Sequence, residues 1–205
     1  MLAPFENELV NFRHNIDSLK HPVLTGPMGV SVLENASVST QPAVARYTLD
    51  SAALPYADTG AHIIAFAKEL KGLNGLQLST KQQIAEGTTF TFASNKPVKV
   101  LVGYFKPKRA AFKATVFAKA PELETNAHAN NYGEADIKIA NAIVLKGMPP
   151  VNIHSYSFNA GTNTLKLPKG ILLILGFVNG DQEIPSYDAG LTEDGTSREI
   201  DWLFE

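Results

Sequence analysis

The sequence of 205 residues contains no cysteine, no basic excess and no long apolar run. The lack of cysteine excludes disulfides, thiolate zinc sites and cysteine nucleophiles. A formal net charge of −2 leaves no surplus of lysine and arginine to neutralise a phosphate backbone, so nucleic acid is not an expected partner. No segment approaches the roughly 20 apolar residues that a membrane helix needs, so membrane insertion is not expected either.

Recognisable catalytic motifs are also missing from the sequence. It contains no glycine-rich dinucleotide or phosphate loop, no serine nucleophile elbow and no zinc-binding His-Glu-x-x-His helix. The five histidines are scattered singly, and the paired histidines of a cupin metal site are absent. The sequence therefore predicts no catalytic residue and no cofactor.

The composition is that of a folded protein with a sizeable core. Hydrophobic residues make up 44% of the chain and charged residues only 19%, which argues against disorder. Near the amino terminus, Leu9, Phe12, Ile16 and Leu19 follow a 3-4-3 spacing and predict a short amphipathic helix over residues 6–20. We therefore expect residues 1–28 to form a helix and linker.

From residue 29 onward the apolar residues recur with period two, which is typical of strands. Phe90 and Phe92 share one face of a segment whose threonines lie opposite, and the apolar run over residues 171–178 predicts a central strand buried on both faces. Short turns separate about ten candidate strands up to residue 180. The predicted fold of residues 29–205 is an antiparallel β-sandwich, most simply a jelly roll. Further strands are predicted at 98–104, 112–116, 137–145 and 165–167.

The polar loop over residues 122–136 is the first candidate for a binding site. It combines amides with a histidine and one aromatic ring, the mixture that recognises the hydroxyls and C–H faces of a sugar. Two other interpretations stay open: the asparagines satisfy the loop backbone, or the loop oxygens hold a structural calcium ion. The candidate ligand-binding residues of this loop are Asn126, His128, Asn130, Asn131 and Tyr132.

A second candidate surface is the strand end that runs into a basic turn over residues 104–109. Tyr104 and Arg109 are its candidate ligand-binding residues. The competing interpretation is a lysine cluster that protects a sheet edge from pairing with another chain.

Two carboxylate pairs keep a catalytic alternative open. Glu122 with Glu124, and Glu134 with Asp136, each place two acids on one face of an extended chain, and a glycosidase requires two carboxyl groups that flank the sugar bond. Such pairs also arise by chance in a chain with twenty acids.

Several short segments together form a familiar pattern: Pro55–Asp58, Leu70–Leu78, Gly87–Phe92 and Pro97–Phe105 in the opening half, and Tyr156–Gly161 with Leu165–Val178 in the closing half. These segments resemble β-sandwich modules of multidomain glycoside hydrolases from gut Bacteroidetes. The resemblance implies a galactose-binding-like jelly roll, a neighbouring catalytic domain and export to the periplasm or cell surface. No signal peptide follows Met1, so the expectation of export rests on the resemblance alone.

We therefore expect a non-catalytic module that binds glycan or supports a polysaccharide-degrading enzyme. The alternatives are a glycoside hydrolase or lyase that uses a carboxylate pair, and a purely structural domain. Carbohydrate and a catalytic domain are the expected partners.

Overall fold

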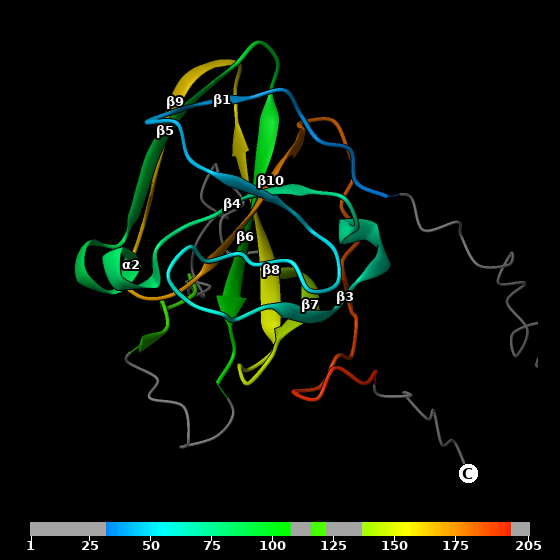
Figure 1. Cartoon of the computed structure of the whole chain (residues 1–205). Helices are drawn as coiled ribbons and strands as arrows, with labels where there is room; N and C mark the ends of the chain where they lie inside the picture. Colours follow the sequence, from blue (N-terminus) through cyan, green and yellow to red (C-terminus); the bar gives the residue numbers. More distant parts are fainter. Residues whose placement is uncertain (1–31, 108–115, 122–136, 198–205) are drawn as a thin grey trace, which may run out of the picture. The chain divides into compact units, whose positions relative to one another are not determined.

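The computed structural model describes residues 32–107, 116–121 and 137–197 (Figure 1). The chain divides into two units, Met1–Ser31 and Val32–Glu205, and every described residue belongs to the second. The helix predicted over residues 6–20 and nearly all of the strand predicted over 112–116 lie outside the described residues. Among the described residues, no helix is long and apolar enough to cross a membrane.

The smaller of two sheets contains three antiparallel strands in the order β1-β5-β9. These are β1 (Ser39–Gln41), β5 (Thr88–Ser94) and β9 (Gly161–Leu167). Strand β9 pairs along the whole length of β5, whereas β1 pairs only with its second half. Figure 1 shows β5 and β9 side by side, with the helix α2 (Thr80–Glu86) at one end of them.

The larger sheet contains eight strands, seven of them in the order β11-β7-β8-β6-β10-β4-β2, and β3 pairs with β7 off this path. All neighbours are antiparallel except β11 and β7, which are parallel. A short 3-10 helix, η1 (Lys68–Leu70), follows β3. The strands are β2 (Arg46–Thr48), β3 (Ile63–Phe66), β4 (Asn74–Leu76), β6 (Val98–Phe105), β7 (Ile137–Leu145), β8 (Val151–Phe158), β10 (Leu173–Asn179) and β11 (Tyr187–Asp188). The predicted antiparallel β-sandwich is confirmed.

The larger sheet is buried on both faces, as the side chains of β10 show. Leu173, Leu175 and Val178 belong to one apolar cluster, while Ile174 and Phe177 belong to the other, which fills the space between the two sheets. Strand β10 lies between β6 and β4. The central strand predicted from the continuous apolar run is therefore confirmed.

Helix α2 is anchored to the sandwich by a carboxylate from a distant loop. Asp58 accepts hydrogen bonds from the backbone N–H groups of Thr80 (2.9 Å) and Lys81 (3.0 Å), and from the Ser79 hydroxyl (2.7 Å). The Ser79 hydroxyl in turn accepts from the N–H of Gln82 (3.3 Å) and so caps the helix. Desolvation acts to raise the pKa of Asp58, but the hydrogen bonds from Lys81, Thr80 and Ser79 outweigh it and hold the pKa well below the usual 3.8.

We expect Asp58→Asn to lower the free energy of unfolding by about 1 kcal/mol at neutral pH, because the amide keeps one acceptor oxygen but loses the other and the negative charge. Because the folded-state pKa is depressed, the carboxylate stabilises the fold fully above its unfolded pKa and loses this effect as pH falls through the folded value. The difference between wild type and variant should shrink below about pH 3.8. Urea titrations at neutral and acidic pH measure this difference in unfolding free energy. A difference that grows on acidification would contradict the stabilising role of the Asp58 carboxylate.

Candidate functional site

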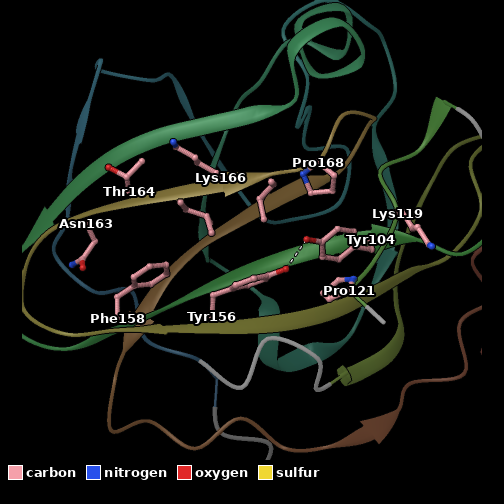
Figure 2. Close-up of a pocket in the computed structure, with 11 residues that line it drawn as sticks. Tyr104, Lys119, Pro121, Tyr156, Phe158, Asn163, Thr164, Lys166 and Pro168 are labelled. Atoms are coloured by element: carbon pink, nitrogen blue, oxygen red, sulfur yellow. Dashed lines mark hydrogen bonds between the residues drawn. The ribbon is translucent and has the colours of Figure 1, made fainter. Parts of the chain in front are cut away.

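A large cleft opens between strand β9 of the small sheet and strands β6 and β8 of the large sheet (Figure 2). Its volume is about 560 Å³, within the range of ligand-binding clefts. We call it the tyrosine cleft. It is lined by Tyr104, Lys119, Pro121, Tyr156, Phe158, Asn163, Thr164, Leu165, Lys166, Leu167 and Pro168.

Two tyrosines from neighbouring strands form the floor of the tyrosine cleft. Tyr104 comes from β6 and Tyr156 from β8, and their hydroxyl oxygens lie 2.7 Å apart in a hydrogen bond (Figure 2). Only 2% of Tyr104 and 6% of Tyr156 is exposed. The ring of Tyr104 also packs edge-on against His154, with centroids 5.0 Å apart. The hydroxyl pair is therefore held in place by buried surroundings.

Residues of β9 and the end of β8 form the walls of the tyrosine cleft. Leu165, Leu167 and the half-buried Phe158 contribute apolar surface. In the described part of the chain, β9 pairs only with β5, so the main-chain groups on its other edge have no strand partner there. Such groups can donate to and accept from a ligand in the same way as a neighbouring strand would.

The charged side chains of the tyrosine cleft lie at its rim. In Figure 2 the amino ends of Lys119 and Lys166 point away from the hydroxyl pair, and no carboxylate occurs among the described lining residues. The interior thus combines apolar walls, two phenolic hydroxyls and strand-edge amides. This combination suits a ligand with many hydroxyl groups and apolar C–H faces.

The structure brings one of the predicted site residues into this cleft. Tyr104 lines it as a buried floor residue, because the alternation that puts Val98, Val100 and Val102 between the sheets puts Tyr104 there too. The other predicted residues, Arg109, Asn126, His128, Asn130, Asn131 and Tyr132, lie outside the described residues, as do both carboxylate pairs.

Sequence reasoning missed Tyr156 and Phe158 as site residues. Tyr156 and Phe158 are separated by one residue of the strand β8, so both project to the same side of it. This alternation could have been recognised in the sequence. What the sequence did not reveal is that β9 leaves this side of the sandwich open.

No group of three or more histidine, cysteine, aspartate or glutamate side chains in the described residues is arranged to hold a metal ion. The loop proposed to hold calcium lies outside these residues.

The chain is similar in structure and sequence to one segment of a carbohydrate-active enzyme. No family model and no curated protein matches the sequence. The solved structure of a GH138 enzyme, described as targeting the pectin rhamnogalacturonan II, matches 90% of this chain with a TM-score of 0.73 and 35% identity. The match covers 21% of that enzyme, so this chain spans about a fifth of its length. The predicted resemblance to a β-sandwich module of a glycoside hydrolase is confirmed at this level.

Proposed function

We propose that this chain is an accessory carbohydrate-binding module of a polysaccharide-degrading enzyme and that it binds glycan in the tyrosine cleft. The observation that carries the proposal is the match, at 35% identity over nearly the whole chain, to one segment of an enzyme that targets a pectin. A segment that makes up about a fifth of such an enzyme is consistent with an accessory module.

The geometry of the tyrosine cleft supports glycan as the ligand. A sugar ring presents C–H groups to apolar walls such as Phe158 and Leu165, and hydroxyls to polar groups such as the Tyr104–Tyr156 pair. The cleft is open and shallow relative to an enclosed cavity, so a single ring buries little area there. We therefore expect weak binding of one sugar and tighter binding of an oligosaccharide that extends along β9.

The proposal includes a neighbouring catalytic domain and export from the cytoplasm. A polysaccharide is too large to cross a membrane, so a module that binds it acts outside the cytoplasm. Tethering to a catalytic domain raises the local concentration of substrate at that domain, which makes weak binding sufficient.

Tyr156→Phe is expected to weaken glycan binding about fivefold, because it removes one hydroxyl worth about 1 kcal/mol of hydrogen bonding without changing the shape of the floor. Isothermal titration calorimetry with pectic oligosaccharides, including fragments of rhamnogalacturonan II, measures the effect. Tyr47→Phe is the matched control: this tyrosine is equally buried, its hydroxyl lies 3.5 Å from the Ile174 carbonyl oxygen, and it lines neither cleft described for this chain.

Three outcomes distinguish the functional alternatives. Equal binding by wild type and Tyr156→Phe would show that the tyrosine cleft is not the site. Absence of binding to every pectic and neutral polysaccharide in affinity electrophoresis would favour a purely structural domain. Release of reducing ends by the purified chain would favour a hydrolase.

A further inference from the structure

A second cleft lies at the opposite edge of the small sheet, between α2, the first half of β5 and the loop over residues 42–45. Its volume is about 350 Å³. We call it the glutamine cleft. It is lined by Pro42, Ala43, Val44, Ala45, Ala57, Gln77, Leu78, Ser79, Gln82, Gln83, Gly87, Thr88, Thr89 and Phe90.

The lining of the glutamine cleft is polar but uncharged. It contains three glutamines, two threonines and a serine, and no acid, base or histidine among its described residues. Val44, Leu78 and Phe90 provide apolar surface between these polar groups. A charged ligand would therefore be desolvated here without a counter-charge in the lining, whereas an uncharged ligand with hydroxyl groups would find partners.

Gln83 is an immobilised hydrogen-bonding group of this cleft with an unused acceptor. It is only 2% exposed. Its side-chain Nε2 donates to the Thr88 hydroxyl and to the Leu172 carbonyl oxygen, each at 3.1 Å, which fixes the orientation of the amide. The Oε1 atom has no hydrogen-bond partner. A buried carbonyl oxygen without a donor is unfavourable, so a ligand hydroxyl that reached this atom would gain a hydrogen bond.

Strand β5 adds main-chain groups to the same cleft. Its residues Thr88–Phe90 pair with β9 on one side, but β1 pairs only with Thr91, Phe92 and Ala93 on the other. In the described part of the chain, the first half of β5 therefore has an open edge toward the glutamine cleft. Main-chain amides at such an edge recognise ligand hydroxyls without carrying charge.

We propose that the glutamine cleft is a second carbohydrate site, specific for an uncharged sugar residue. The three observations that support it are the uncharged polar lining, the unused acceptor of Gln83 and the open edge of β5. The site is separate from the tyrosine cleft, because the two clefts share no lining residue and flank opposite edges of the small sheet. Binding at the glutamine cleft and binding at the tyrosine cleft can therefore be tested independently.

The probes for this site are two methyl glycosides that differ only at C6: methyl galactoside, which has a hydroxymethyl group there, and the methyl glycoside of galacturonic acid as its sodium salt, which has a carboxylate. ¹H–¹⁵N spectra of the full chain, recorded while each sugar is added up to its solubility limit, report binding at individual amides. We expect methyl galactoside, or the methyl glycoside of another neutral sugar such as rhamnose or arabinose, to shift the amides of residues 88–90 and the side-chain NH₂ of Gln83. The galacturonate should bind there at least about tenfold more weakly.

Thr89→Trp should abolish these shifts, because Thr89 is an exposed residue of the lining and a bulky ring there fills the cleft. The matched control is Thr162→Trp, since Thr162 is also an exposed residue of the same sheet and lines neither cleft. Gln82→Ala, on the exposed side of α2, is a second variant that leaves the core intact and should weaken binding. Tyr156→Phe should leave it unchanged.

The proposal is overturned if no neutral glycoside shifts the amides of residues 88–90. It is also overturned if galacturonate binds there as well as galactoside, or if Thr89→Trp and Thr162→Trp bind alike.

Discussion

Leu173→Asp is expected to lower the free energy of unfolding by more than about 4 kcal/mol, enough to prevent a domain of typical stability from folding well. Leu173 is 1% exposed and lies in the central strand β10, where it belongs to the apolar cluster on one face of the large sheet. An aspartate there would bury an unpaired charge and remove a packed side chain at once. Urea unfolding followed by circular dichroism measures the loss.

Leu54→Asp is the matched control for this prediction. It makes the same chemical change at a leucine that is 45% exposed, so we expect an effect within about 0.5 kcal/mol. If both variants unfold at the same urea concentration, β10 is not the buried centre of the sandwich.

Gly176→Ala is expected to cost roughly 2–5 kcal/mol of unfolding free energy, because strained backbone and overpacking act together. Gly176 has φ +126°, and the pairing of β10 with β6 shifts register between Ile174 and Gly176. A Cβ atom at this position would lie 2.7 Å from the main-chain oxygen of Asn74 on the neighbouring strand β4. Backbone cannot move aside as a flexible side chain can, so the two strands would have to separate.

Gly60→Ala tests whether this effect is specific. A Cβ at Gly60 would meet no atom within 4 Å, so the substitution should be neutral or slightly stabilising through the unfolded state. Thermal melts of the two variants give the comparison. Equal melting temperatures would show that the close approach of β10 and β4 does not exist in solution.

The strands of this protein could be predicted because their chemistry is local. The threonine–phenylalanine alternation over residues 88–94 marks β5, and the continuous apolar run over 171–178 marks β10 as a strand covered on both faces. In the described residues up to 180 there are ten strands, as the spacing of the turns predicted. The short helix α2 was not predicted, because its seven residues hold only one large apolar side chain, the exposed Ile84, and give no apolar stripe. Its capping carboxylate, Asp58, comes from a loop more than twenty residues earlier.

The candidate binding sites were harder to predict from the sequence than the strands. The sequence pointed to the polar loop over 122–136 and to the strand end at Tyr104, where aromatic residues and polar groups occur together. The loop lies outside the described residues, so that prediction stays untested, whereas Tyr104 lies in the floor of the tyrosine cleft beside Tyr156. The glutamine cleft, with Gln83 in its lining, was not predicted. No sequence pattern reveals the Tyr104–Tyr156 pair, because the two residues are separated by 52 positions. They meet only because β6 and β8 are neighbouring strands.

The sequence by itself determined the class of fold, the central position of β10 and the kinship with modules of carbohydrate-active enzymes. These follow from the period of apolar residues and from short segments of similar sequence, both of which are properties of neighbouring residues. Only the tertiary structure decided where the sandwich is open. A cleft forms where a strand of the small sheet lacks a partner, along the outer edge of β9 and beside the first half of β5. Strand pairing depends on contacts between distant segments, and no local pattern records which edges stay unpaired.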